Sequence, residues 1–268
     1  MSSMTSTAAP SSINASTLWV PMNPAPPVTT TRSAMLGAMV GRLPDQAIKA
    51  QTVETMFDHI AGRYDLLNAL MTFGLDARWR RRAVRELRLP RGSLVVDLAC
   101  GTGDFCEELQ RRGLRPLGVD FAAEMLAHAH TRAPLVRADI LHLPLHDGAM
   151  DGAVCGFALR NVVDIGACFA ETARVLRPDG RAAFLEVAQP RSPLVRSAHS
   201  LYFNRVVPAL GALISDRRAY EYLPASVAYL PGSATMLRML QQAGFRDARC
   251  FGLAAGAVQL LTATRRAA

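Results

Sequence analysis

The chain has 268 residues, half of them apolar, and it carries 30 basic against 22 acidic residues, a formal net charge of +8. The apolar share excludes a wholly disordered chain, and no apolar run reaches the roughly 20 residues that span a bilayer, so no transmembrane helix is expected. Lys49 is the only lysine, and a coding bias toward arginine explains the basic residues more simply than a nucleic-acid partner does.

Residues 1–44 differ from the rest of the chain. They are rich in Ser, Thr, Ala and Pro and contain no acid before Asp45. The apolar stretch around Leu18-Trp19-Val20 is cut short by Pro21 and follows no charged segment, so a secretory signal is not expected. Arg32 and Arg42 are too few for a typical organelle transit peptide. The composition therefore predicts a disordered tail.

From residue 45 onward the pattern is that of a globular domain, which we expect to extend to residue 268. Residues 45–90 have apolar side chains at helical spacing and predict a helical lead. Segments typical of strands and helices then alternate, which predicts an α/β fold with a doubly wound, mostly parallel sheet. The expected strands are 93–98, 117–119, 135–138, 150–156 and 181–187, and the expected helices are 76–89, 104–112, 122–132 and 164–176.

The last third of the chain interrupts this alternation. Residues 192–230 are helical in pattern and bear aromatic side chains, so they form an insertion. A final helix is expected over 234–243, ended by Gly244 as its C-cap. The segments 249–253 and 258–264 are expected to close the sheet as a strand pair.

The most informative motif lies after the first strand. Asp97 belongs to a β-branched strand that runs into Gly101-Thr102-Gly103 and then into a helix beginning at Asp104. Glycines allow the backbone to approach a ligand, and a helix N-terminus offers unpaired N–H groups. A dinucleotide-binding motif would have a third glycine where Cys106 stands, and the Gly-Lys-Ser/Thr of a phosphate loop is absent.

Acidic residues follow the next two strands. Asp120 stands where a carboxylate can accept both hydroxyls of a ribose. Asp139 can accept from an exocyclic adenine amine, with Ile140 covering the ring. Together with the glycine turn, this arrangement resembles the seven-stranded, Rossmann-like class I of S-adenosylmethionine-dependent methyltransferases over residues 90–264. The resemblance implies an S-adenosylmethionine site formed by Asp97, Gly101, Thr102, Gly103, Asp120, Asp139, Ile140 and Gly156.

Two further segments narrow the resemblance. Tyr64-Asp65-Leu66-Leu67-Asn68 precedes the cofactor motif, and Leu159-Arg160-Asn161 follows the fourth strand. Over residues 50–264 the chain is similar to the ubiquinone/menaquinone biosynthesis C-methyltransferases, which methylate a ring carbon of a polyprenylated quinol. Residues 192–230 match that family's substrate-side insertion. The chain departs from the family's usual residues at Asp76, Gly156, Ala158, Asp179 and Ala188.

The family resemblance also implies roles on the acceptor side. Methylation of a quinol carbon requires withdrawal of a hydroxyl proton, and Arg160 is expected to stabilise the quinolate or orient a water, because arginine is itself no base. Asn161 is expected to orient that water, and Asp104 to hold Arg160 by an ion pair. Tyr64 and Tyr202 are expected to line the acceptor pocket.

Partners and compartment follow from the remaining features. The arginines between Arg78 and Arg91 form either a solvated helix face or a contact with anionic lipid headgroups on the inner face of the membrane. No aromatics interleave with them, so nucleic acid is not expected. The cysteines are widely spaced and His142 and His146 are separated by Pro144, so neither a metal site nor a disulfide framework is expected, and the location is expected to be cytoplasmic.

Two other functions remain open from the sequence. The departures from the family pattern allow a methyltransferase that acts on another small aromatic metabolite. A non-catalytic scaffold subunit of a quinone-biosynthesis complex is the alternative outside enzymes, although such a subunit would not need an intact donor site. The sequence does not indicate the prenyl length, the choice between naphthoquinol and benzoquinol, or the oligomeric state.

Overall fold

The computed structural model describes residues 64–190, 192–202 and 230–267, together with residues 53, 55, 57, 62, 205 and 226. The predicted tail and most of the predicted insertion lie outside these residues, as does the boundary at residue 45. Within the described part of the chain, no helix is long and apolar enough to cross a membrane.

A seven-stranded sheet forms the centre of the molecule, with the strand order β3-β2-β1-β4-β5-β7-β6. The first five strands in this order are parallel, and β7 runs antiparallel to both β5 and β6. This confirms the predicted doubly wound, mostly parallel sheet. The strands are β1 Leu94–Leu98, β2 Arg115–Asp120, β3 Leu135–Arg137, β4 Met150–Gly156, β5 Leu176–Val187, β6 Phe245–Leu253 and β7 Val258–Arg265.

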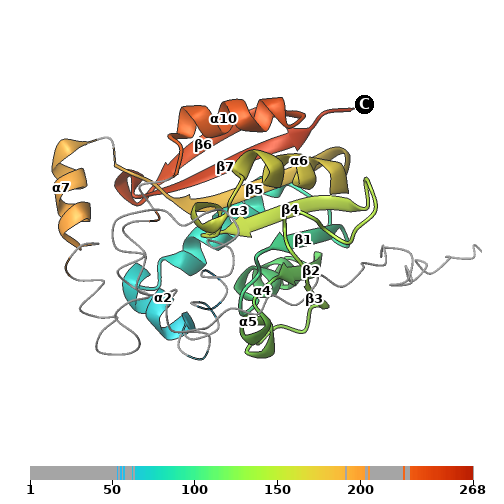
Figure 1. Cartoon of the computed structure of the whole chain (residues 1–268), viewed down its shortest axis with the longest axis horizontal. Helices are drawn as coiled ribbons and strands as arrows, with labels where there is room; N and C mark the ends of the chain where they lie inside the picture. The colour runs from blue at the N-terminus through green and yellow to red at the C-terminus, as the bar shows by residue number, and fades with distance from the viewer. Residues whose placement is uncertain are drawn as a thin grey trace, which may run out of the picture.

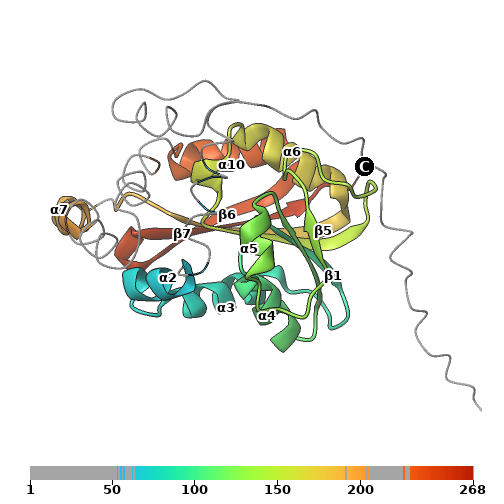
Figure 2. The same cartoon turned by 60° about the horizontal axis from the view of Figure 1, so that its bottom comes forward.

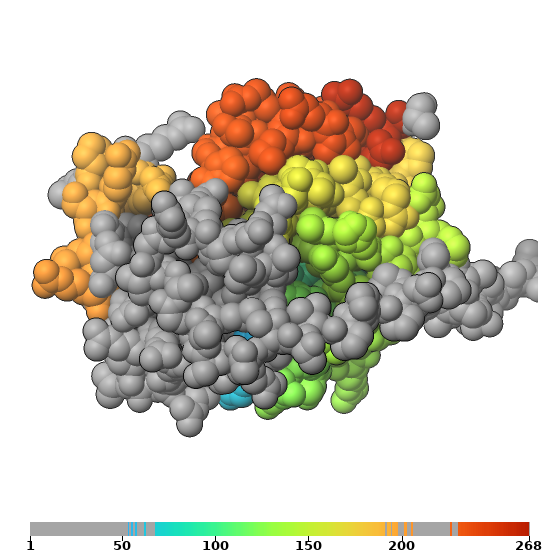
Figure 3. Space-filling view, in the orientation of Figure 1, coloured from blue at the N-terminus to red at the C-terminus, as the bar shows by residue number. Residues whose placement is uncertain are grey.

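Helices cover both faces of the sheet (Figures 1 and 2). Helices α3 and α4 pack on one face, α6 and α10 on the other, while α2 and α7 lie together at one end of the molecule. In the space-filling view α6 and α10 form a continuous surface, and α7 stands apart from it (Figure 3). The helices are α2 Tyr64–Thr72, α3 Asp76–Leu87, α4 Asp104–Arg111, α5 Ala123–Ala127, α6 Ile165–Val175, α7 Pro193–Leu201 and α10 Ser233–Gln242, with single 3₁₀ turns η4 Leu159–Asn161 and η6 Ala254–Gly256.

Alternation along β1 decides which residues face the site. Val96 and Leu98 join the apolar core beneath α6 and α10, whereas Val95 joins the core beneath α3 and α4. Because successive side chains of a strand point to opposite faces, Asp97 lies on the same face as Val95. The carboxyl group is thereby buried under α3 and α4, next to the glycine turn.

Three elements differ from the sequence prediction by four or five residues at one end, and β6 begins at Phe245 rather than at residue 249. β5 begins at Leu176 rather than at residue 181, because a bulge continues the strand: the register moves from Met150–Leu176 to Gly152–Arg181, with Asp179 at a φ of +63°. Helix α5 ends at Ala127 rather than at residue 132. The chain after it turns back onto the glycine turn, where the His130 N–H donates to the Thr102 carbonyl.

Candidate active site

The glycine turn between β1 and α4 has a backbone that few side chains tolerate. Gly101 and Gly103 have φ values of +54° and +95°, in the left-handed region that favours glycine. A Cβ at Gly103 would lie 2.6 Å from the Thr131 Cγ2, so no other residue fits there without displacing Thr131. The turn therefore presents bare backbone at the start of α4, as the motif predicts.

Main-chain N–H groups hold the acidic residue that ends β2 and the one that follows β3. Asp120 is buried, and its carboxylate accepts from the Gly101 N–H at 2.8 Å and from the Ala122 N–H at 2.9 Å. The exposed Asp139 accepts from the Leu141 N–H at 2.9 Å, and Ile140 beside it is buried. Each carboxylate keeps lone pairs for a further donor.

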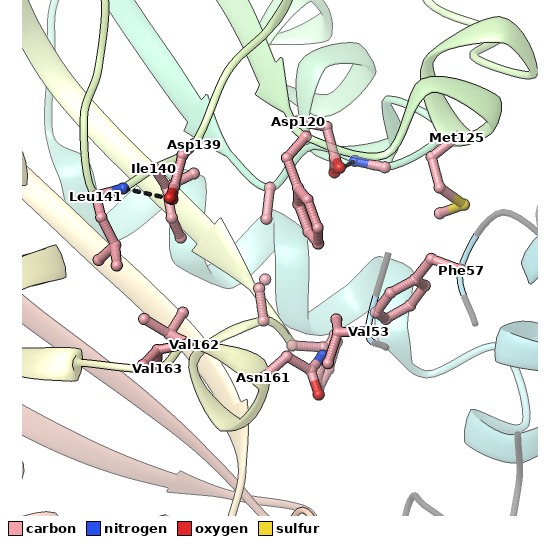
Figure 4. Close-up of a pocket in the computed structure, with 16 residues that line it drawn as sticks. Val53, Phe57, Asp120, Met125, Asp139, Ile140, Leu141, Asn161, Val162 and Val163 are labelled. Atoms are coloured by element: carbon pink, nitrogen blue, oxygen red, sulfur yellow. Dashed lines mark hydrogen bonds between the residues drawn. The ribbon is translucent and has the colours of Figure 1, made fainter. Parts of the chain in front are cut away.

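These residues line a cleft with about 860 Å³ of open space, which we call the main cleft. Figure 4 shows Asp120 and Asp139–Leu141 on one side of it and Asn161–Val163 on the other, with Val53 and Phe57 forming a further wall. The Asn161 Oδ1 is buried and has no hydrogen-bond partner in the described part of the chain. The cleft therefore combines apolar walls with polar groups at opposite ends, as ligand sites do.

A second hollow, the inner pocket, adjoins the main cleft and has about 390 Å³ of space, part of it open to solvent. Ala99, Gly101, Gly156 and Phe157 line both. A Cβ at Gly156 would lie 2.6 Å from the Phe105 ring, so Phe105 explains why glycine stands at this position. The inner pocket is more polar than the main cleft, and its polar lining residues are Asn68, Arg80, Asp97, Thr102 and Asp104.

Asp97 is the unusual group of the inner pocket. It is buried, its Oδ2 accepts from the Cys106 thiol at 3.3 Å, and its Oδ1 has no partner in the described residues. Burial raises the pKa of the carboxyl from 3.8 to about 8. At neutral pH Asp97 is therefore mostly protonated, and an unpaired buried oxygen of this kind is favourable only where a ligand completes it.

Arg80 is the residue of this site that the sequence analysis missed. Its guanidinium is nearly buried between two carboxylates, at 2.6 Å from Asp76 and 3.1 Å from Asp104. Asp76 also accepts from Asn68 at 3.3 Å and from Thr72 at 3.0 Å, which ties α2 to α3. A signal was present, because positions 76, 80, 83, 84 and 87 form the buried stripe of α3, and an arginine on such a stripe needs partners.

The expected ion pair between Asp104 and Arg160 is wrong. Arg160 instead pairs with Glu186 at 2.8 Å, and it also donates to the Phe157 carbonyl. The reason is the sheet: β4 and β5 are neighbours, so the turn after β4 lies against Glu186, whereas Asp104 starts a helix that packs on α3. Arg160 and Glu186 are both buried, and Arg160 does not line either cavity.

Of the two tyrosines expected in the acceptor pocket, only Tyr202 has its side chain among the described residues. The Tyr202 hydroxyl donates to the Met71 carbonyl at 2.9 Å, and its ring contacts Phe73, so it lies in the contact between α2 and the end of α7 and does not line either cavity. Partial burial raises its pKa. Tyr64 begins α2, but its side chain lies outside the described residues. The substrate roles of both residues stay predictions.

The residues present fit S-adenosylmethionine. The main cleft offers the Asp120 carboxylate for a ribose and Asp139 with Ile140 for an adenine, while the inner pocket offers an unpaired Asp97 oxygen for an ammonium group. Gly103 lines neither cavity, and its contribution is that it allows the backbone to form the turn. Among the described residues no group of three or more His, Cys, Asp or Glu side chains could hold a metal ion.

Comparison with known proteins identifies the family. The model of the "ubiE/COQ5 methyltransferase family" matches residues 45–265. The chain is 43% identical to a demethylmenaquinone methyltransferase of Roseiflexus castenholzii, over 80% of this chain and 94% of that protein. It is 40% identical to a ubiquinone/menaquinone biosynthesis C-methyltransferase of Syntrophotalea carbinolica, over 80% and 94%.

Solved structures share the fold at lower identity. A methyltransferase in complex with the Haloferax volcanii Trm112 activator superposes with a TM-score of 0.59 and 17% identity, over 79% of this chain and 98% of that chain. This likeness concerns the fold alone.

Proposed function

Because the chain belongs to the ubiE/COQ5 methyltransferase family, we propose that it methylates a ring carbon of a polyprenylated quinol, converting demethylmenaquinol to menaquinol or acting on the equivalent benzoquinol. The protein is an S-adenosylmethionine-dependent methyltransferase. The single observation that carries the substrate assignment is its 36–43% identity, over most of its length, to relatives named for this ring methylation.

The donor site divides between the two cavities. Asp120 would accept the ribose hydroxyls, and Asp139 with Ile140 would hold the adenine in the main cleft. The glycine turn leads into the inner pocket, where Asp97 would hold the ammonium group and Arg80 would attract the carboxylate of the amino-acid part. When bound, the cofactor supplies a methyl group on a sulfonium, so the task of these residues is to hold donor and acceptor in line.

The acceptor side is built on the η4 turn. Asn161 is the polar group that reaches the main cleft from this turn, with an unpartnered Oδ1 that can orient a quinol hydroxyl or a water that takes its proton. Arg160 is a positioning residue: its pair with Glu186 and its bond to the Phe157 carbonyl fix the turn that carries Asn161.

This assignment also implies where the protein works. A polyprenylated quinol resides in the lipid bilayer, so the enzyme must meet it at the membrane surface. We propose that it is a cytoplasmic protein that binds peripherally to the inner face of the membrane.

Complementation tests the proposed function. Strains blocked in ring C-methylation of menaquinone or of ubiquinone are given the wild-type chain, the Asp120→Ala variant or the Arg238→Gln variant, and their quinones are measured by mass spectrometry. Wild type and Arg238→Gln, an exposed change on α10, are expected to restore a methylated quinone, and Asp120→Ala is not. Failure of an expressed, cofactor-binding wild type in both strains would overturn the substrate assignment.

A further inference from the structure

Large exposed apolar side chains gather in one region of the described structure. Solvent reaches 77% of Phe73, 60% of Leu201, 40% of Leu70 and 37% of Leu75, and no other large apolar residue of the described part of the chain is so exposed. Three of them belong to α2 and the turn after it, and Leu201 ends α7. Single exposed apolar residues are common on protein surfaces, but a group of four rimmed by charge marks a contact surface.

Two contacts join these segments, although about 130 residues of sequence separate them. The Tyr202 hydroxyl, directly after α7, donates to the Met71 carbonyl of α2 at 2.9 Å. The Tyr202 and Phe73 rings lie 5.9 Å apart between centroids. Figures 1 and 2 show α2 and α7 at the same end of the molecule in both views. We call Leu70, Phe73, Leu75 and Leu201 the apolar tip.

The backbone holds Phe73 out of the fold. Phe73 has a φ of +53°, and Gly74 after it has a φ of +68°. A residue other than glycine in this region costs roughly 1 kcal/mol. The Phe73 and Gly74 N–H groups donate to the carbonyls of Leu70 and Ala69, so the turn is a fixed end of α2. This fixed turn at the end of α2 leaves most of the Phe73 side chain in solvent.

Positive charge adjoins the apolar tip. Helix α3 begins three residues after Phe73, and Arg78 and Arg81 lie on its exposed face. Within the described part of the chain no acidic side chain pairs with either of them, whereas Arg80 between them is buried on Asp76 and Asp104. An apolar group with arginines beside it complements the boundary between acyl chains and anionic headgroups.

We propose that the apolar tip inserts into the surface of an anionic lipid bilayer, with Arg78 and Arg81 on the lipid phosphates. The proposal deepens the proposed function and rests on it for its purpose, because a polyprenylated acceptor must be drawn from the membrane. Helix α2 carries the tip at its end and Asn68 at the wall of the inner pocket, so binding through the tip brings the donor site close to the bilayer.

Vesicle flotation of the full chain tests the docking surface. The wild type is measured with vesicles of phosphatidylcholine alone and with 30% phosphatidylglycerol, beside Phe73→Ser/Leu201→Ser, Arg78→Gln/Arg81→Gln and the control Arg238→Gln. We expect the tip variant to lose about tenfold in partitioning into both vesicles, since two apolar side chains no longer insert. The arginine variant should lose binding mainly with the anionic vesicles, and Arg238→Gln should behave as wild type.

Cofactor affinity, turnover with a soluble quinol and oligomeric state are measured beside vesicle binding. Both variants should bind S-adenosylmethionine with unchanged affinity, which shows that they fold. With a short-chain, water-soluble quinol their turnover should equal that of the wild type, so a failure of the proposed function appears as inactivity of the wild type itself. Unchanged partitioning of the tip variant would overturn the inference. So would a dimer that Phe73→Ser converts to monomer without any loss of vesicle binding, because the tip would then be an interface between two copies.

Discussion

The donor half and the acceptor half of the site are held together in different ways. On the donor side, main-chain N–H groups hold the carboxylates: Asp120 binds the N–H groups of Gly101 and Ala122, and Asp139 binds that of Leu141. On the acceptor side, two side chains from distant parts of the chain hold each other, since Arg160 pairs with Glu186 at 2.8 Å.

The difference predicts which changes alter binding and which alter stability. A carboxylate held by a local turn can be removed at small cost to the rest of the fold, and the loss appears in the affinity for the cofactor. A buried ion pair between two elements cannot lose one partner without leaving the other charge unpaired. We therefore expect donor-side variants to lose affinity and acceptor-side variants to lose stability.

Arg160→Leu should have the largest effect. It leaves Glu186, which solvent does not reach, without its cationic partner, and breaking a buried pair in this way costs about 3–5 kcal/mol. Urea unfolding should show this loss in the free energy of unfolding. A loss below about 1 kcal/mol, the value of an exposed pair, would contradict the buried arrangement.

The double variant Arg160→Leu/Glu186→Leu is the control for this measurement. It replaces both charges with apolar side chains, so it should recover a large part of the stability that Arg160→Leu loses. If Asn161 depends on the pair for its position, turnover stays low in the double variant although stability returns. Equal recovery of stability and turnover would contradict the positioning role of Arg160.

The fold and the geometry of the glycine turn were predictable from sequence because their signals are local. The alternation of strands and helices predicts the sheet, and the glycine turn with Asp120 follows from residues within one β-α-β unit. The early start of β5 was not predictable from alternation, because Arg177-Pro178-Asp179-Gly180 has the composition of a turn and joins the strand only through a bulge against β4.

The acceptor half was less predictable because its partners are distant in sequence. The pairing of Arg160 with Glu186 depends on β4 and β5 being neighbours. To predict that Arg160 pairs with Glu186 and not with Asp104, one must know the register of these two strands. Arg80 is the exception within the donor site, because it belongs to a run of arginines that predicts a solvated or lipid-facing surface. Only the helical phase shared with Asp76 and Ala83 distinguishes it, and a run of arginines hides that phase.

Asp120→Ala sharpens the comparison from the donor side. The change removes the carboxylate proposed to accept the ribose hydroxyls, and it also removes the acceptor of the Gly101 and Ala122 N–H groups. We expect the affinity for S-adenosylmethionine to fall about 100-fold, a loss of about 2.7 kcal/mol, in calorimetry. The free energy of unfolding should change less than in Arg160→Leu. The reverse ranking would contradict the division between the two halves.

Asp97 makes cofactor binding depend on pH. Its pKa is raised to about 8 by burial, and an ammonium group needs the ionised carboxylate. Since about half of the carboxyl groups are ionised at pH 8 and about one in a hundred at pH 6, the dissociation constant should rise about 50-fold between these values. Binding should release a proton, which calorimetry in buffers of different ionisation enthalpy detects.

Asp97→Asn is the control for this titration. It should bind the cofactor more weakly but with an affinity that stays constant between pH 6 and pH 8. Asp97 also makes stability depend on pH. Between pH 3.8 and about 8 the folded chain holds a proton on Asp97 that the unfolded chain releases. The contribution of Asp97 to the free energy of unfolding therefore falls as pH rises through this range. Asp97→Asn should lack that fall. A persistent pH dependence of affinity in Asp97→Asn would assign it to another group.

Asp104→Asn should have the smallest effect, because its ion pair is the longer and more exposed of the two that Arg80 makes. Arg80 keeps Asp76 as its closer partner, at 2.6 Å, and the Asp104 side chain is 29% exposed, so solvent screens part of the lost attraction. We expect a loss of about 1 kcal/mol in the free energy of unfolding and a several-fold loss of cofactor affinity. The matched control is Asp147→Asn, which removes an ion pair with Arg174 at 2.6 Å whose Asp147 side chain is 81% exposed. That variant should change neither quantity measurably, and if the two variants behave alike, Asp104 contributes to the site no more than a surface carboxylate does.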